Sequence, residues 1–270
     1  MPLVLSGDLV LLPAEAALDA DSPLVGWHNV VAATTIVADV QDASFPASNL
    51  ANPATHLEWR STSTALQYVT ITTNYVGQID YVGIAKHNFG SAGIAVSLGY
   101  FTAGPTWNEL VAPFIPADDK PIMLRFTPQG QAEVKIKLAA GSAAPRAAVV
   151  YCGKLLVVPR IYSGHTPLPY GRRNTGTSGM SESGNFLGSI ITGEWRETVL
   201  PFRLIDPAFY RGKMDAFVAS ANARTPFFFA WRPSSYPLEV GYGWLTDNAE
   251  PVPEAPSNLF TLSMSVRGIA

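Results

Sequence analysis

Cysteine and charged residues are scarce in this chain of 270 residues. Cys152 is the single cysteine, so no disulfide can form within the chain and no cluster of thiolates can bind a metal. Only 14% of the residues are charged, against roughly 25% in an average soluble domain. Two explanations stay open: a β-rich protein whose faces are coated with Ser and Thr, or a subunit whose surface is largely buried by neighbours.

Long apolar runs and basic stretches are also missing. Hydrophobic residues make up 47% of the chain, but no run approaches the roughly 20 residues that span a bilayer, so we expect no membrane span. A net charge of −3 provides no basic surface, so we expect no nucleic-acid partner. The N-terminal segment has no Lys or Arg before its apolar part, which argues against a secretory signal and favours folding in a reducing cytoplasm.

Motifs of enzymes and metal sites are absent from the sequence. It contains no G-x-S-x-G elbow, no P-loop and no H-E-x-x-H. The four histidines lie far apart in the chain: His28, His56, His87 and His165. Only His56 has a carboxylate nearby, at Glu58, although a metal site built from distant segments stays open. We therefore predict that the protein is not an enzyme and has no catalytic residues, no cofactor and no metal.

Short alternating segments predict a mainly β fold. They cover residues 34–40, 68–73, 79–87, 94–101, 121–128 and 132–140, with turn residues near their ends. In the last of them Val134, Ile136 and Leu138 face one way, while Lys135 and Lys137 face the other. Because no convincing helical pattern lies between these segments, we predict a jelly-roll or β-sandwich over residues 30–158, preceded by an N-terminal arm at 1–29.

The second half of the chain predicts a separate β-rich domain with one α-helix. Residues 159–185 are rich in Pro, Gly and Ser, and we expect a linker or long loop there, followed by the domain at 186–270. A helix is predicted near 207–224, capped by Asp206 with Pro207 at its first position. Its apolar stripe should pack in the core: Tyr210, Met214, Phe217, Val218 and Ala221.

Several motifs occur in order within the first half. They are Phe45-Pro46-Ala47-Ser48-Asn49-Leu50, Trp59-Arg60-Ser61, Gln67-Tyr68-Val69-Thr70-Ile71, Ile79-Asp80-Tyr81-Val82-Gly83-Ile84 and His87-Asn88. As a set they resemble the discoidin-like, galactose-binding-like β-sandwich, especially the version found in tail proteins of bacterial viruses. The resemblance implies that Trp59 plugs the sandwich. The chain departs from it at Thr72-Thr73-Asn74, where the family often has Asp-Leu-Gly, so the resemblance implies the fold more firmly than ligand binding.

The segments 181–205, with strands predicted from residue 186, and 225–233 lie on either side of the predicted helix. This order resembles distal-tail and related baseplate proteins. Together the two resemblances imply a structural virion protein of a siphophage-type tail tip or baseplate, assembled in the host cytoplasm. Such a bacteriophage protein would join tail tube to tip as a homo-oligomer with three- or six-fold symmetry, and its partners would be other tail and baseplate proteins.

Two sets of residues are candidates for binding. The proposed subunit interface consists of Arg172, Arg173, Phe227, Trp231, Tyr242 and Trp244, with a hydrophobic core as the alternative for its aromatic members. The rival function is a carbohydrate-binding module that recognises a host surface glycan through Trp59, His87, Asn88 and Trp107. The alternative for His87 and Asn88 is that they close a turn. An enzyme acting on cell-wall polymer is a third hypothesis, for which no acid pair or nucleophile is found.

Overall fold

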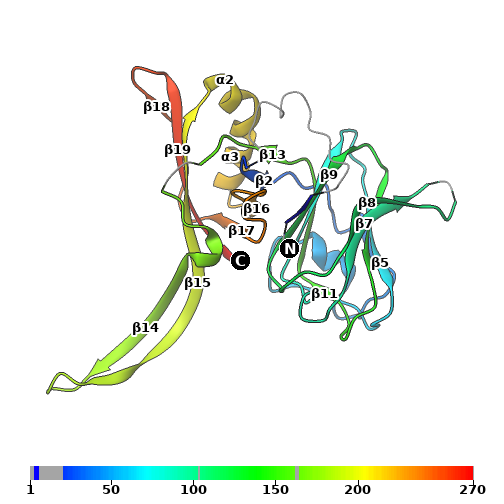
Figure 1. The fold of residues 1–270 in the computed structure, drawn as a ribbon, viewed down its shortest axis with the longest axis horizontal. Coiled ribbons are helices and arrows are strands. Elements are labelled where there is room, and N and C mark those ends of the chain that lie inside the picture. Colours follow the sequence, from blue (N-terminus) through cyan, green and yellow to red (C-terminus); the bar gives the residue numbers. More distant parts are fainter. Residues whose placement is uncertain (1–2, 6–20, 103, 162–163, 270) are drawn as a thin grey trace.

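Residues 3–5, 21–102, 104–161 and 164–269 are described by the computed structural model, and they form two β-rich units (Figure 1). The first unit is the predicted sandwich. One of its sheets has the order β1 (Leu3–Leu5), β9 (Ile122–Gln129), β6 (Ile79–Ala85) and β12 (Val149–Gly153). The other has the order β3 (Ile36–Ala38), β5 (Gln67–Thr72), β10 (Glu133–Leu138), β7 (Val96–Phe101) and β8 (Trp107–Phe114). A short pair, β4 (Trp59–Arg60) with β11 (Arg146–Ala147), and the turn η1 (Ala47–Ala51) complete it.

The alternating pattern of the sequence explains the core of the sandwich. In β10 the side chains of Val134, Ile136 and Leu138 are buried between the sheets, whereas Lys135 and Lys137 lie on the outer face, as predicted. Strand β6 is buried on both sides, because its second face packs against the other unit.

The second unit is built on one long sheet. Its strand order is β13 (Leu156–Val157), β2 (Leu24–Gly26), β16 (Phe227–Ala230), β17 (Val240–Leu245), β19 (Leu259–Ile269), β15 (Phe186–Ile205) and β14 (Arg172–Met180). Strand β18 (Val252–Glu254) pairs with β19, and the turn η2 (Leu168–Tyr170) precedes β14. The mainly β fold with a second β-rich unit is therefore confirmed.

The predicted helix is confirmed in type, position and facing. It runs as α2 (Pro207–Phe209), the π-helical turn η3 (Tyr210–Met214) and α3 (Asp215–Asn222). The Asp206 carboxylate accepts a hydrogen bond from the N–H of Ala208 at 3.3 Å, which caps the helix. All members of the predicted apolar stripe are buried, and they pack in one cluster with β15, β16 and β19: Tyr210, Met214, Phe217, Val218 and Ala221.

The predicted boundaries need correction at both ends of the sandwich. The linker prediction for 159–185 is wrong from residue 172 onwards, because β14 lies there and pairs with β15. Of the predicted arm at 1–29, residues 1–2 and 6–20 lie outside the described residues. The described parts are strands: β1 pairs with β9 of the sandwich, and β2 pairs with β13 and β16 of the second unit.

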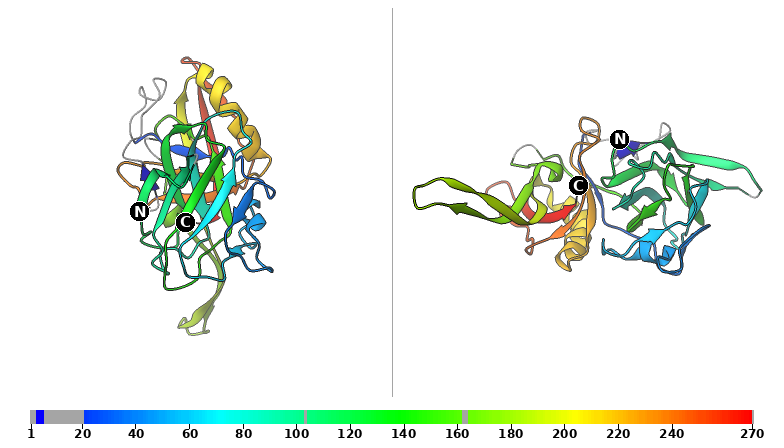
Figure 2. Two further views of the ribbon diagram at one scale, coloured as in Figure 1. Left: turned by 90° about the vertical axis from the view of Figure 1, so that its right-hand side faces the viewer. Right: turned by 90° about the horizontal axis from the view of Figure 1, so that it is seen from below.

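A buried aromatic cluster joins the two units, which lie side by side in the right-hand view of Figure 2. Tyr151 of β12 contacts Phe228 of β16 and Tyr242 of β17, with ring centroids 5.5 and 5.9 Å apart. The Tyr242 hydroxyl donates to the carbonyl of Pro53 at 2.7 Å, and the Tyr151 hydroxyl donates to that of Pro226 at 3.1 Å. Each unit therefore satisfies polar groups of the other.

Candidate functional site

Trp59, a predicted glycan contact, lies inside the sandwich. Its side chain has no exposed surface, and its indole Nε1–H donates a hydrogen bond to the carbonyl of Val40 over 3.2 Å. A ring enclosed by the core cannot stack on a sugar. The prediction of a glycan contact at Trp59 is therefore wrong, and the residue fills the core as the resemblance implied.

His87 and Asn88 are buried as well, and they close a turn. The Asn88 side chain donates to the carbonyl of Ala144 and accepts from the N–H of Arg146, each over 2.9 Å. The His87 ring stacks on that of Phe89, with centroids 4.7 Å apart, and its Nδ1 accepts from the N–H of Phe89. Because these groups hold the backbone of the turn, the prediction that they contact a glycan is wrong.

Burial of His87 predicts a dependence of stability on pH. Removal from water lowers the pKa of the imidazole to about 4, whereas in the unfolded chain it is about 6.5. The folded state therefore favours the neutral ring. The contribution of the neutral His87 ring to the free energy of unfolding is fully present above about pH 6.5. It is lost as the pH falls towards 4, and the loss is at most about 3 kcal/mol.

Chemical denaturation of the wild type and of His87→Gln at several pH values between 4 and 8 tests this expectation. Burial also lowers the pKa of His28 and of His165, so part of the decline should remain in the variant. A decline of the same size in both proteins would show that His87 contributes nothing to it.

Trp107, the fourth predicted glycan contact, lies on the outer face of the five-stranded sheet. Its ring clusters with those of Tyr68 and Phe101, with centroids 5.3 to 5.8 Å apart. Lys137 Nζ lies 5.4 Å from the centroid of the Trp107 ring, and Lys135 Nζ lies 6.0 Å from that of Phe101. Phe101 is 38% exposed, and the other four are half-buried. We call these five residues the aromatic face.

The backbone beneath the aromatic face explains its shape. Phe101 of β7 is paired with Trp107 of β8, and Lys137 of β10 is paired with Tyr68 of β5, so the face spans four neighbouring strands. Gly99 lies under the Trp107 ring, because a Cβ at this position would come within 2.5 Å of it. The missing side chain allows the ring to lie against the sheet.

Phe227 and Tyr242, predicted at a subunit interface, are buried within the chain. Phe227 packs against Phe217 of α3, with centroids 5.1 Å apart, and is 1% exposed. Tyr242 is completely buried between the two units. The prediction of a subunit interface is therefore wrong for both residues. They belong to the hydrophobic core, which was the alternative.

Trp231 and Trp244 keep part of their surface exposed. Trp231 stacks on Tyr236 with nearly parallel rings, 5.7 Å between centroids, and its Nε1–H donates to Glu239. Trp244 lines a hollow of about 550 Å³ beside the middle of β15. The residues around this hollow are Glu194, Trp195, Arg196, Trp244, Arg267, Gly268 and Ile269. A role of the two tryptophans in subunit contacts stays a prediction.

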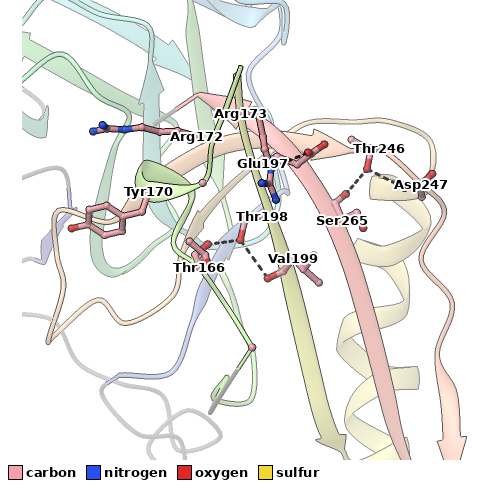
Figure 3. Close-up of a pocket in the computed structure, with 12 residues that line it drawn as sticks. Thr166, Tyr170, Arg172, Arg173, Glu197, Thr198, Val199, Thr246, Asp247 and Ser265 are labelled. Carbon is pink, nitrogen blue, oxygen red and sulfur yellow. Dashed lines mark hydrogen bonds and ion pairs between the residues drawn. The ribbon is translucent and has the colours of Figure 1, made fainter. Parts of the chain in front are cut away.

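Arg172 and Arg173 begin strand β14 beside a groove of about 450 Å³ (Figure 3). Arg173 forms an ion pair with Glu197 of β15 at 3.7 Å, and Arg267 pairs with the same carboxylate at 3.2 Å. Arg172 points away from that ion pair in Figure 3 and is exposed. Both arginines line the groove and are exposed, and their role at an interface stays a prediction.

The antiparallel pair β14 and β15 forms a hairpin that projects away from the rest of the second unit (Figure 1). Its turn is closed between Ser181 and Asn185, with Gly184 at a φ of +82°. The large apolar side chains near its tip are 61–72% exposed: Met180, Phe186, Leu187, Ile190 and Ile191. We call these five residues the apolar tip.

Two further observations concern the described part of the chain. Among those residues, no group of three or more His, Cys, Asp and Glu side chains is placed to hold a metal ion. No described helix has both the length and the apolar character needed to cross a membrane.

Comparisons with known proteins give structural neighbours only. No protein-family model and no curated protein matches the sequence. Chitosan-binding module 1 of a chitosanase/glucanase from Paenibacillus sp. IK-5 is 15% identical, with a TM-score of 0.39 over 46% of this chain and 98% of that chain. The family 32 module of NanJ from Clostridium perfringens, in complex with galactose, is 12% identical, with a TM-score of 0.39 over 47% and 98%. The family 32 module of AlyQ, in complex with 4,5-unsaturated mannuronic acid, is 17% identical, with a TM-score of 0.36 over 47% and 96%.

These neighbours are carbohydrate-binding modules, which is the kind of galactose-binding-like sandwich that the first half of the sequence resembles. The resemblance to tail proteins of bacterial viruses stays a prediction. Identities and TM-scores this low carry no information on what the present chain binds.

Proposed function

We propose that this protein is a structural assembly subunit that binds neighbouring subunits through the projecting hairpin. The observation that carries the proposal is the apolar tip, which is about two-thirds exposed on an arm directed away from the chain's own core. A two-stranded ribbon is marginally stable in water by itself. Burying each of these side chains contributes on the order of 1–2 kcal/mol, so a partner surface would stabilise the arm.

The two faces of the hairpin suggest how partners are arranged. Ile190 and Ile191 are consecutive in β15 and therefore point to opposite sides of the ribbon, and both are exposed. A ribbon that is apolar on both sides fits between two surfaces better than against one. Head-to-tail contacts of this kind form a ring if the rotation between neighbouring subunits closes, and the proposal assigns them a three- or six-fold rotation.

The setting of this assembly is proposed from the sequence resemblance. The second unit would join tail tube to tail tip in a siphophage-type virion, with other tail and baseplate proteins as partners, and would have no enzymatic activity. Sedimentation and electron microscopy of the purified full-length protein test the assembly. Closed rings of three or six subunits support the proposal, whereas a monomer at every concentration would overturn it.

Glycan recognition by the sandwich is a second candidate function, favoured by the aromatic face. Three clustered rings on an outer sheet surface offer stacking area for a sugar, and the bordering lysines offer hydrogen-bond donors. Trp107→Ala should lower the affinity for a bound glycan by tenfold or more while leaving the fold intact, because the ring lies outside the core.

A glycan array probed with the full-length protein, followed by titration of the best ligand, measures this loss. Tyr170→Ala is the matched control, since Tyr170 is an exposed aromatic residue of the second unit. Absence of binding to any sugar, or equal affinity in Trp107→Ala, would exclude this function for the aromatic face.

A further inference from the structure

We propose that the aromatic face binds a carboxylated polysaccharide, a chain of uronic acid residues, in preference to a neutral one. This inference rests on the proposed glycan recognition and names its substrate class. It places the ligand on the outer surface of the five-stranded sheet, at the predicted contact Trp107 but away from the other predicted contacts, Trp59, His87 and Asn88.

Lys137 supplies the charge for this preference. It lies between Tyr68 and Ser97 in the sheet register, and its ammonium group is the cation nearest to the Trp107 ring. Among the described residues it has no ion pair, so its charge is available to a ligand. Lys135 differs, because it pairs with Glu133 at 3.4 Å and donates to Thr70 Oγ1 at 2.9 Å.

The geometry suits a sugar that carries its charge at the edge of the ring. Lys137 Nζ lies over the Trp107 ring, 5.4 Å from its centroid, so a pyranose that stacks on this face displaces the flexible lysine side chain. The displaced ammonium then lies at the edge of the sugar, where an equatorial carboxylate can accept a hydrogen bond from it. A charge-assisted hydrogen bond of this kind is about twice as strong as a neutral one. The neighbouring rings of Tyr68 and Phe101 would support adjacent sugars of the same chain.

Three carboxylates lie on this side of the sheet. Asp39 accepts a hydrogen bond from the N–H of Tyr68 at 2.9 Å, and the other two have different consequences for binding. Glu133 is paired with Lys135, so its charge is largely compensated. Glu109 is exposed on β8, two residues after Trp107 and on the same side of the strand. Because like charges repel, Glu109 should weaken the binding of an anionic polymer. Removing Lys137 and removing Glu109 should therefore change the affinity in opposite directions.

The experiment compares two polymers with the same backbone, polygalacturonate and its methyl-esterified form, on the full-length protein. The wild type should bind the acid at least tenfold more tightly than the ester. Lys137→Gln should bring this ratio close to one without changing the affinity for the ester. Glu109→Gln should raise the affinity for the acid severalfold. Trp107→Ala should abolish the binding of both polymers.

The outcomes separate this inference from the glycan proposal beneath it. Equal affinity of the wild type for acid and ester overturns the charge preference but leaves glycan recognition standing. If the protein binds neither polymer and no sugar on the array, both the charge preference and glycan recognition are overturned. Equally tight binding of polyacrylate, which has carboxylates but no sugar rings, would also overturn the inference, because stacking on Trp107 would then play no part.

Discussion

Truncating Phe228 to alanine is expected to lower the free energy of unfolding by about 3–5 kcal/mol, the usual cost of removing a buried aromatic ring. Phe228 has no exposed surface and lies at the junction between the two units. Its ring centroid is 4.8 Å from that of Tyr242 and 5.5 Å from that of Tyr151. The variant would therefore lose packing within the second unit and across the junction. Chemical denaturation at neutral pH measures the loss.

Gly83 allows the junction itself to be tested. A Cβ at this position of β6 would come within 2.7 Å of the Phe228 ring, which cannot move away because it is enclosed. Gly83→Ala should therefore destabilise the wild type by about 1–3 kcal/mol. In the Phe228→Ala background the same substitution should cost much less, because the added methyl group then fills space.

Tyr242→Phe is the conservative control for this pair of measurements. It keeps the ring and removes only the hydrogen bond to Pro53, so a loss of about 1 kcal/mol is expected. If Gly83→Ala costs the same in both backgrounds, the two units do not meet at Phe228 in solution.

The junction also shows why part of the sequence interpretation failed. The run from Phe227 to Trp231 is aromatic enough for a subunit interface, but such residues are equally suited to an interface within one chain. Phe227 and Phe228 point to opposite faces of β16, one towards the helix and the other towards the sandwich. The amino-acid composition shows how apolar a strand is. Whether each face of the strand packs within the chain or against another subunit depends on the fold.

Elements with a clear periodicity were predictable, and elements without one were not. The alternation of β10 and the capped stripe of 207–222 both specified their buried faces, because a single face of each packs on a core. Strand β14 has the sequence RRNTGTSGM and is exposed on nearly every residue. With no core to face, it carries no apolar alternation, and its Gly and Ser content resembles that of a loop.

The candidate site was predictable by residue type but not by location. Trp59 and Trp107 are each the first residue of a strand, yet one is completely buried and the other lies on an outer face. Tyr68 and Phe101 complete the aromatic face and were missed, because their contact depends on the pairing of β5, β10 and β7. The outward position of Lys135 and Lys137 was the signal in the sequence that could have led to that face.

Replacing the apolar tip should convert an assembled protein into a monomer. The proposed variant carries Phe186→Thr, Leu187→Thr, Ile190→Thr and Ile191→Thr, which keep the β-branched or strand-compatible character of the hairpin. Its own stability should change little, because these side chains are 61–72% exposed and contribute little to the core. If each buried side chain contributes on the order of 1–2 kcal/mol to association, losing four weakens it by several orders of magnitude.

Sedimentation of wild type and variant over the same range of concentrations measures this effect, and circular dichroism verifies that the fold is retained. The matched control is Val37→Thr with Val76→Thr, which removes exposed apolar side chains from the sandwich instead. Because the proposal locates the contact in the hairpin, the control should assemble as the wild type does. If the hairpin variant forms the same rings as the control, the interface does not lie in the hairpin. The residues around the hollow at Trp195 and Trp244 would then be the next to substitute.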